Sequence, residues 1–284
     1  MFFISEVSSN HSQSIDRSLE FIDQSAAVGC DAVKFQLFKT EMLFSKEVFD
    51  SNPETIKRKQ WELPIEFLPV LSQRCKEKGI QFSCTPFYID AVDELNQYID
   101  FFKIASYELL WDDLIIACVK TGKPLILSTG MATMDEIRHA VEITNKNGCQ
   151  NLTLLHCTSA YPTPYEEANL AAIATLRNEF GCKVGWSDHT VDSGVINRAI
   201  NRWGAEVVEF HMDLEGAGEE FESGHCWLPK NIGHVIKQVR HGLIADGEGI
   251  KNPSVSELPD RNWRTDPSDG LRPMKSIRDT LEKQ

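Results

Sequence analysis

The stretch FFKIAS, residues 101–106, is a short apolar run that contains a lysine and ends in a serine. Similar short apolar runs recur along the chain, and longer segments with helical periodicity separate them. This alternation is typical of βαβ units that build a parallel sheet. The expected strands are residues 2–7, 32–36, 81–84, 101–104, 125–128, 152–156, 184–187 and 207–211. These units predict the α/β class and, within it, a (β/α)8 TIM barrel.

Local signals predict helices between these strands. The expected helices are residues 14–28, 66–78, 89–97, 114–120, 134–146, 168–180, 194–203 and 230–244. Thr133 followed by Glu136 predicts a capping box, and Gly29 and Gly79 lie where glycine favours a left-handed C-cap. Residues 38–64 are too long for a tight connection, so we expect them to cover the carboxyl face of the barrel or to contact a partner.

Composition limits the classes of function. With 284 residues, 42% of them hydrophobic, the chain can form one barrel domain, residues 1–245, with an irregular tail, residues 246–284, packed on it. The net charge of -13 argues against a nucleic acid or a membrane surface as partner. No apolar run spans a membrane and the first residues lack a signal peptide, so we expect a cytoplasmic protein. The eight cysteines form no CxxC pair and are expected to be ordinary reduced thiols.

Two histidines follow neighbouring strands. His189 and His211 lie in the sequences SDH and EFH, and Glu209 lies beside the second. Because the carboxyl ends of the strands meet at one face of a barrel, the two imidazoles could share a divalent metal and leave positions open for water and substrate. The alternative interpretation is that each histidine is only a hydrogen-bonded polar residue at a strand end.

Two lysines lie inside apolar runs. Lys34 and Lys103 are expected to point into the barrel, where a buried ammonium group needs an anionic partner. Hydroxyl groups at nearby strand ends would complete a site for a phosphate or a carboxylate; they belong to Ser106, Ser128, Ser159 and Ser187. In one alternative the lysines pair internally with Glu6 or Glu108, and in another one lysine forms a Schiff base. Glu6 itself could position a hydroxyl or act as a base.

A set of motifs occurs in order across residues 4–211: SEVSSNH, GCDAVKFQLFK, FSCTPF, FKIASYEL, GKPLILSTGMAT, LLHCTSAYPTP, VGWSDHT and VVEFH. This set resembles the sialic acid synthase (N-acetylneuraminate synthase) family, which condenses phosphoenolpyruvate with an N-acylated amino sugar. In the family mechanism the enol C3 attacks the metal-bound aldehyde, and water adds to the oxocarbenium-like C2. Phosphate then leaves by C–O cleavage, which gives a 2-keto-3-deoxy sugar acid.

The resemblance implies roles for the residues at the strand ends. Phosphoenolpyruvate would be held by Lys34, Lys103, Ser106, Ser128, Ser159 and Ser187. A divalent cation, Mn2+ or Mg2+, would be bound by His189 and His211. The acceptor sugar would contact Gln36, Glu108 and Tyr161, and Glu6 would position the acceptor or the reacting water. From their places at strand ends, Glu209 is also predicted to be catalytic and Thr85 to bind substrate.

The chain departs from the family pattern at three places. Ser8 and Gln13 replace glycines around the first motif. The family's glycine-proline-aspartate segment, whose acid touches the acceptor, is replaced by DLEGAGEEFESGHCWLP, where the possible substitutes are Glu219, Glu220, Glu222 and His225. The family commonly adds an antifreeze-like domain that reaches the partner's acceptor site, and we expect this domain to be lacking after the barrel here. Arg264, Arg272, Lys275 or a separate chain would then supply that contact, or the acceptor lacks the N-acyl group.

The leading hypothesis is therefore a metal-dependent synthase of a sialic-acid-like nonulosonic acid that serves polysaccharide biosynthesis. Its partners would be phosphoenolpyruvate and an amino sugar, and family habit suggests a homodimer. A metal-dependent aldolase using pyruvate, or a synthase acting on a phosphorylated acceptor sugar, is a second interpretation. A non-catalytic sugar-binding paralogue is a third.

Overall fold

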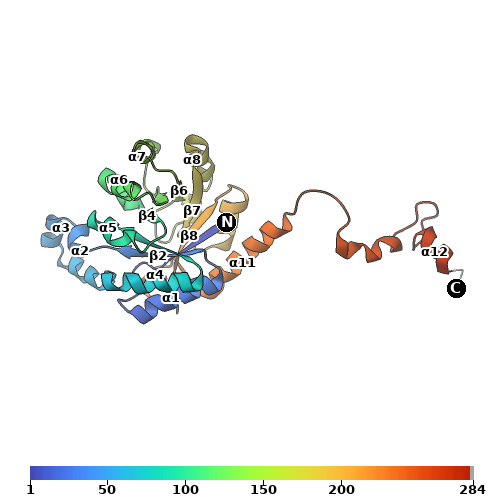
Figure 1. Cartoon of the computed structure of the whole chain (residues 1–284), viewed down its shortest axis with the longest axis horizontal. Coiled ribbons are helices and arrows are strands. Elements are labelled where there is room, and N and C mark those ends of the chain that lie inside the picture. Colours follow the sequence, from blue (N-terminus) through green and yellow to red (C-terminus); the bar gives the residue numbers. More distant parts are fainter. Residues whose placement is uncertain (282–284) are drawn as a thin grey trace. The chain divides into compact units, whose positions relative to one another are not determined.

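The computed structural model describes residues 1–281 and contains a parallel barrel (Figure 1). Its strands are β1 (Phe2–Glu6), β2 (Ala32–Leu37), β3 (Gln81–Pro86), β4 (Phe102–Ile104), β5 (Leu125–Ser128), β6 (Leu152–Cys157), β7 (Lys183–Asp188) and β8 (Val207–Met212). They are ordered β3-β2-β1-β8-β7-β6-β5-β4, and a parallel bridge between Ser83 and Phe101 joins the two ends of this order. The predicted (β/α)8 barrel is confirmed.

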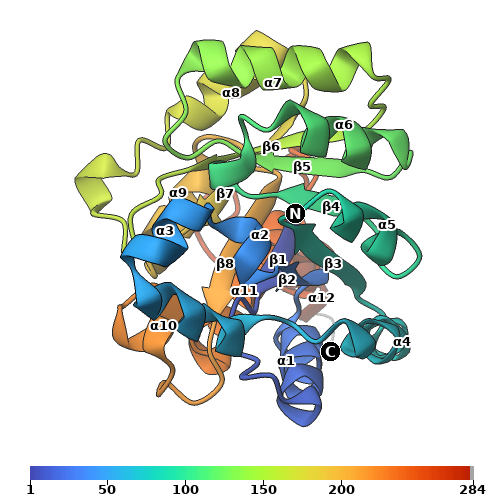
Figure 2. The ribbon, with the colours of Figure 1, turned by 90° about the vertical axis from the view of Figure 1, so that its left-hand side faces the viewer.

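Helices surround the strands on the outside (Figure 2). They are α1 (Ile15–Val28), α4 (Leu68–Lys78), α5 (Asp90–Asn96), α6 (Asp112–Lys120), α7 (Met134–Lys146), α8 (Ala172–Phe180), α9 (Ser193–Asn201) and α11 (Pro229–Ala245). The capping box of α7 forms as predicted, with both Thr133–Glu136 bonds present. Gly29 and Gly79 cap α1 and α4 in the left-handed region. Helix α8 begins later than predicted because a 3-10 turn, η4 (Tyr165–Glu167), precedes it.

Two layers of apolar residues hold the barrel. Outward-facing strand residues such as Phe3 and Val208 belong to the large core that includes the helices. A second, smaller cluster alternates with them and fills the inside of the barrel; we call it the apolar plug, and it consists of Ile4, Ala32, Phe101, Ile126, Leu155 and Val207. Because strand side chains alternate between faces, the next inward residue of each strand lies above the plug, toward the carboxyl face.

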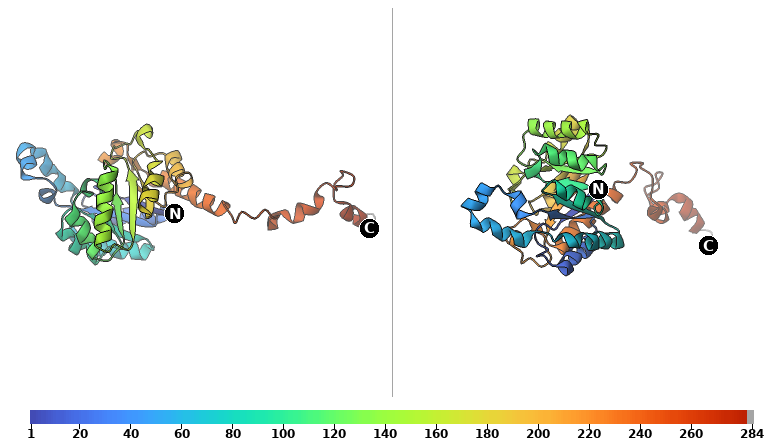
Figure 3. Two further views of the ribbon diagram at one scale, coloured as in Figure 1. Left: turned by 90° about the horizontal axis from the view of Figure 1, so that it is seen from above. Right: turned by 60° about the vertical axis from the view of Figure 1, so that its left-hand side comes forward.

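The long connection after β2 folds into short helices. These are α2 (Thr40–Leu43), α3 (Lys46–Ser51), η1 (Pro53–Trp61) and η2 (Ile65–Phe67). They project from the rest of the barrel unit (blue in Figure 3) and lie in front of the strands in Figure 2. The Gln13 side chain donates to the carbonyls of Lys59 and Glu62, at 2.8 and 3.0 Å, and so anchors this insert to the β1–α1 loop. Its role as a lid or a partner contact stays a prediction.

The departures at Ser8 and Gln13 fall on residues with positive φ, 51° and 52°. Glycine adopts this left-handed conformation more easily than residues with a side chain, which agrees with the glycines that the resemblance implies at these positions. In this chain Gln13 supplies the two hydrogen bonds to the insert that a glycine would lack.

The remaining elements are short. They are η3 (Ser106–Glu108), α10 (Glu219–Glu222), β9 (Cys226–Trp227), η5 (Val255–Glu257), η6 (Pro259–Trp263) and α12 (Lys275–Leu281). The chain divides into two compact units, Met1–Arg240 and a second that starts at His241. The predicted packing of residues 246–284 on the barrel stays a prediction. Across residues 1–281, no helix has the length and apolar character needed to cross a membrane.

Candidate active site

A polar layer lies directly above the apolar plug. It consists of Glu6, Lys34, Lys103, Ser128, Cys157 and Glu209, each two residues beyond a plug residue and each buried. The period of two along a strand therefore turns these side chains inward and places them at one depth. The sequence prediction that Lys34 and Lys103 point into the barrel agrees with this arrangement.

Ion pairs join the lysines to two carboxylates. Lys34 Nζ lies 2.5 Å from Glu6 Oε2 and 3.9 Å from Glu209 Oε1, and Lys103 Nζ lies 3.5 Å from Glu209 Oε1. The internal pairing that the sequence left open is thus present for Lys34 with Glu6, whereas Lys103 pairs with Glu209 rather than with Glu108. Glu209 links the two lysines across the barrel.

Burial acts differently on the two ammonium groups. It opposes the charge of Lys34, but Glu209 and Glu6 outweigh it and raise the pKa of this lysine. Burial and the neighbouring Lys34 together lower the pKa of Lys103, against the attraction of Glu209. Burial also opposes the charge of Glu209, yet the two lysines bring its pKa below the usual value. Lys103 is therefore the less compensated cation, and a bound anion beside it would stabilise its charge.

Polar side chains next to Lys34 form one hydrogen-bonded group. Lys34 Nζ donates to Thr85 Oγ1 at 3.2 Å. Gln36 Nε2 donates to Glu6 Oε1 at 2.6 Å and to Ser8 Oγ at 3.3 Å. Strands β1, β2 and β3 thus bring together three predicted site residues, Glu6, Gln36 and Thr85.

A cradle of hydroxyl and amide groups lies on the β4–β6 side. The Gly130 amide donates to Ser106 Oγ at 3.0 Å, and the Cys157 sulfur lies 3.7 Å from Ser106 Oγ and 4.0 Å from Ser159 Oγ. A Cβ atom at Gly130 would lie only 2.2 Å from Ser159 Oγ and 2.8 Å from Ser106 Oγ. The position therefore requires glycine. We call Ser106, Gly130, Cys157 and Ser159 the serine cradle.

The serine cradle contains two residues that the sequence analysis did not select. Gly130 lies in the LSTGMAT motif, which was a signal for it, whereas Cys157 was taken for an ordinary thiol. Burial opposes the thiolate of Cys157, but the neighbouring His189, Ser106 and Lys103 lower its pKa overall. Ser128 Oγ is buried and lacks a hydrogen-bond partner among residues 1–281, and Ser187 is buried at the end of β7.

The two predicted metal-binding histidines lie together. Their ring centroids are 5.4 Å apart, and the Tyr161 ring lies 4.2 Å from His189 and 6.0 Å from His211. His189 Nδ1 lies 2.9 Å from the Thr158 carbonyl. Because a carbonyl oxygen only accepts, this nitrogen carries the proton and Nε2 keeps its lone pair. His189 thus has a tautomer suited to a divalent cation, and His211 lies beside it.

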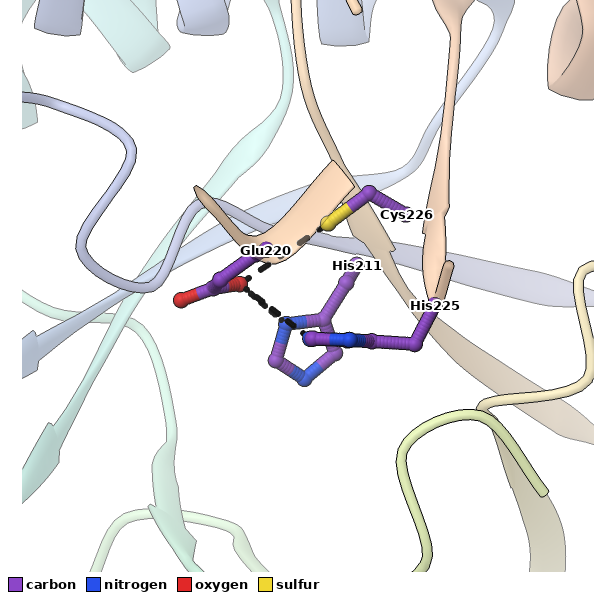
Figure 4. Close-up of side chains that lie close together, drawn as sticks. All are labelled: His211, Glu220, His225 and Cys226. Carbon is purple, nitrogen blue, oxygen red and sulfur yellow. Dashed lines mark hydrogen bonds and ion pairs between the residues drawn. The ribbon is translucent and has the colours of Figure 1, made fainter. Parts of the chain in front are cut away.

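A second group of possible metal ligands includes His211 (Figure 4). One ligand atom each from His211, Glu220, His225 and Cys226 lie within 4.8 Å of one another. Strand β9 pairs with β8 and sets Cys226 opposite His211. Of the acids named as substitutes in the sequence, Glu220 enters the site with His225, whereas Glu219 and Glu222 are exposed. The described residues therefore include a possible metal site around His211.

The two other residues that the resemblance assigns to the acceptor, besides Gln36, are Glu108 and Tyr161. Burial raises the pKa of Glu108 to about 7, although Lys103 acts to lower it, and Glu108 Oε2 has no hydrogen-bond partner among residues 1–281. Tyr161 is 42% exposed. Burial raises the pKa of its phenol, so this group is a hydrogen-bond donor at neutral pH.

The barrel with its polar layer, serine cradle and histidine pair defines a class of barrel synthases. The chain belongs to the NeuB family, whose model matches residues 21–251. It is 37% identical over 266 residues to an uncharacterized protein of Methanocaldococcus jannaschii, covering 90% of this chain and 76% of that one. It is 34% identical over 273 residues to the N,N'-diacetyllegionaminic acid synthase of Campylobacter jejuni, covering 91% and 81%.

A solved structure supports the same family. The N-acetylneuraminic acid (sialic acid) synthetase from Leptospira borgpetersenii, in complex with citrate, has a TM-score of 0.79 and 28% identity, covering 100% of this chain and 93% of that chain. The predicted resemblance and the predicted enzyme class, a phosphoenolpyruvate-dependent transferase that forms C–C bonds, are confirmed.

Proposed function

We propose that this enzyme condenses phosphoenolpyruvate with an N-acylated amino-sugar aldehyde and releases phosphate. The product would be a sialic-acid-like 2-keto-3-deoxy nonulosonic acid used in polysaccharide biosynthesis. The observation that carries the proposal is the polar layer, where two buried lysines adjoin the serine cradle on one side and the histidine pair on the other. Relatives named as legionaminic acid and pseudaminic acid synthases support the same class of acceptor.

The donor fits the lysine side of the layer. Phosphoenolpyruvate carries a carboxylate and a phosphate, and Lys103 is the cation that lacks full compensation. The hydroxyls of Ser106 and Ser159 would donate to the phosphate, joined by Ser128, whose buried hydroxyl needs a partner. Ser187 and Lys34 would complete the donor site.

The histidine pair fits the divalent cation that the family implies. His189 has a free Nε2, and its Nδ1 is fixed by the Thr158 carbonyl, which is the usual arrangement of a metal-binding histidine. Bound there, Mn2+ or Mg2+ would act as a Lewis acid on the sugar aldehyde. Tyr161, whose ring packs at a tilt against His189, would present its phenol to the acceptor.

Different side chains would take part in different steps of the reaction. The lysines and the serine cradle hold phosphoenolpyruvate so that its C3 faces the aldehyde carbon, and a C–C bond forms as the enol π electrons move. Positive charge develops at C2, where the Glu209 carboxylate between the two lysines stabilises it. Water adds at C2 and gives one proton to Glu6, which Gln36 orients, and Glu6 passes this proton to the former aldehyde oxygen, which becomes a hydroxyl. The hydroxyl left on C2 gives its proton to the phosphate as the C2–O bond to phosphate breaks, which leaves the 2-keto acid and inorganic phosphate.

The acceptor sugar would contact Gln36, Glu108 and Tyr161, as the resemblance implies.

The test must include the alternative substrates, because a phosphorylated acceptor, or pyruvate as donor, would use the same barrel. Purified protein with Mn2+ should release phosphate from phosphoenolpyruvate only when an N-acyl amino sugar is present. Mass spectrometry should show the condensed acid. No turnover over a broad sugar panel, or turnover with pyruvate in place of phosphoenolpyruvate, would contradict the proposal.

Two variants test the assignment of residues. His189→Ala should abolish metal-dependent turnover, and Lys103→Ala should raise the KM for phosphoenolpyruvate by at least about tenfold, because a charge-assisted contact is worth about 1.5–3 kcal/mol. Lys120→Ala removes an exposed lysine of α6 and is the matched control. Full activity of His189→Ala would contradict the metal assignment.

A homodimer in the cytoplasm remains our prediction for the assembled enzyme.

A further inference from the structure

Glu220 is the centre of a small group of polar contacts beside the histidine pair (Figure 4). Its Oε2 atom lies 2.9 Å from His211 Nδ1, 3.5 Å from His225 Nε2 and 3.8 Å from Cys226 Sγ. Its Oε1 atom accepts from the Ser9 hydroxyl at 3.0 Å. The side chain is 17% exposed. It therefore joins the β1–α1 loop to β8 and β9, across the site.

The contact with His211 fixes the position of a proton. An ionised carboxylate only accepts hydrogen bonds, so the ring nitrogen 2.9 Å away, Nδ1, must donate. The neutral His211 ring then carries its proton on Nδ1 and its lone pair on Nε2.

His189 has the same tautomer as His211, but a different kind of hydrogen-bond acceptor fixes it. Its Nδ1 donates to a backbone carbonyl, that of Thr158. The two rings, 5.4 Å apart, thus both have Nε2 as the free nitrogen. In metal sites a ligating histidine usually donates its other N–H to a carboxylate or a carbonyl, which orients the ring and raises its basicity. Glu220 and the Thr158 carbonyl correspond to these two kinds of partner.

We propose that Glu220 is a positioning residue that holds His211 with Nε2 directed to the cation, an inference that rests on the proposed function of the histidine pair. Ser9, His225 and Cys226 keep the carboxylate in place. Helix α10 carries two further acids, Glu219 and Glu222, but their side chains are exposed. Glu220 is therefore the acid of this helix that can hold His211. A carboxylate–histidine–metal arrangement is thus assembled from the loop that replaces the family's glycine-proline-aspartate segment.

The alternative geometry makes Glu220 a direct ligand together with His225 and Cys226. The 2.9 Å separation of Glu220 Oε2 and His211 Nδ1 is that of a charge-assisted hydrogen bond, so the two atoms already satisfy each other. A direct site would also use Nδ1 of His211, whereas His189 offers Nε2. The two geometries predict different losses when Glu220 changes.

The test measures Mn2+ affinity by electron paramagnetic resonance titration of the protein and four variants. Glu220→Gln should weaken Mn2+ binding by about 10–100-fold, the usual effect of losing an outer partner. Glu222→Gln, a matched change on the same helix, should bind as the wild type does. His189→Ala and His211→Ala should lose binding altogether. Thermal unfolding of each variant checks that the fold is intact.

A second measurement does not require the metal. Long-range 1H–15N spectra of the metal-free protein at a pH of about 8 report the tautomer of each histidine, and His211→Ala identifies the signal. The wild type should show the proton on Nδ1 of His211, and Glu220→Gln should shift part of the population to Nε2. Glu222→Gln should leave the tautomer unchanged.

Three results would overturn the inference about Glu220. They are unchanged Mn2+ affinity in Glu220→Gln, a loss as complete as that of His211→Ala, and a wild-type His211 protonated on Nε2. Failure of the proposed function would be different. In that case the wild type would bind no Mn2+, or His189→Ala would bind it normally, while the His211 tautomer would still respond to Glu220→Gln.

Discussion

Gly130 shows how one missing side chain shapes the donor site. A Cβ atom there would lie 2.2 Å from Ser159 Oγ and 2.8 Å from Ser106 Oγ, distances that no real contact adopts. We predict that Gly130→Ala displaces both hydroxyls and raises the KM for phosphoenolpyruvate by at least about tenfold, since two hydrogen bonds to an anion are weakened. Steady-state kinetics with varied phosphoenolpyruvate measures this.

The matched control for Gly130→Ala is Gly242→Ala. Gly242 lies in α11, and a Cβ atom there would have no neighbour within 4 Å among the described residues. Its replacement should leave the KM unchanged and stabilise the helix by up to about 1 kcal/mol. An unchanged KM in Gly130→Ala would show that the serine cradle does not contact the donor.

Glu108 makes the stability of the protein depend on pH. Burial raises its pKa to about 7 from the ordinary value of 4.5, so folding favours the protonated acid. The stability that this group contributes is therefore fully present below the unfolded pKa and is lost as pH rises through 7. Glu108→Gln removes the titration. Between about pH 5 and pH 8.5 the variant should lose about 2–3 kcal/mol less stability than the wild type.

Urea denaturation at both pH values measures the Glu108 effect. The exposed Glu166→Gln should follow the wild-type pH dependence and serves as control. Parallel pH profiles of Glu108→Gln and the wild type would mean that Glu108 is ionised and well solvated in the folded protein.

Inward-pointing strand residues could be predicted from the strand pattern, whereas the choice among neighbouring residues of a loop could not. The period of two directs Lys34, Lys103 and Glu209 inward as soon as the strands are recognised. Glu220 was one of several candidate acids in its loop, because sequence spacing does not tell which carboxylate of a short helix turns toward His211. Cys157 was missed because its environment comes from three different strands and loops.

Among the elements, β7 ends in a buried acid, Asp188, two residues after Trp186. Asp188 is fully buried. It accepts from the indole nitrogens of Trp186 and Trp227, at 3.0 and 2.9 Å, and from the hydroxyl of Thr190 at 2.7 Å. These contacts fix the end of β7 against β9 and so orient His189, the next residue. The carboxylate satisfies donors on both of its oxygens.

We predict that Asp188→Asn destabilises the protein by about 3 kcal/mol. An amide must direct its NH2 group at donors on one side, which leaves at least one buried N–H without an acceptor. Urea denaturation at neutral pH measures the loss. The control is Asp192→Asn at the N-cap of α9, where asparagine caps as well as aspartate does, so its stability should stay near that of the wild type. Equal stabilities of the two variants would contradict the role of Asp188.

Most elements could be predicted from the sequence because local and global signals agree. The strand β5 and the helix α7 have the predicted bounds, since the apolar run and the capping box mark their ends. The insert after β2 could not be resolved into α2, α3 and η1, because short helices of this kind depend on contacts such as Gln13 with Lys59. Closure of the barrel at Ser83 and Phe101 likewise depends on the whole fold.

At the scale of the whole molecule, the enzyme must bind an anion although its own charge is negative. The net charge is -13, whereas the cations that would hold phosphoenolpyruvate are buried in the polar layer. Long-range repulsion from the surface therefore opposes the approach of the donor, and short-range attraction holds it once it has entered. Salt acts on these two forces unequally, because it screens exposed charges far more than buried ones.

We predict that kcat/KM for phosphoenolpyruvate rises about two- to fivefold as potassium acetate increases from about 20 to 200 mM, where the screening length falls to below about 10 Å. The KM for a neutral N-acyl amino sugar should stay constant over the same range, which makes the acceptor an internal control. Initial rates at fixed free Mn2+ measure both parameters. A kcat/KM that falls steadily with salt would show that exposed cations, rather than the buried lysines, capture the donor, and it would place the binding site outside the polar layer.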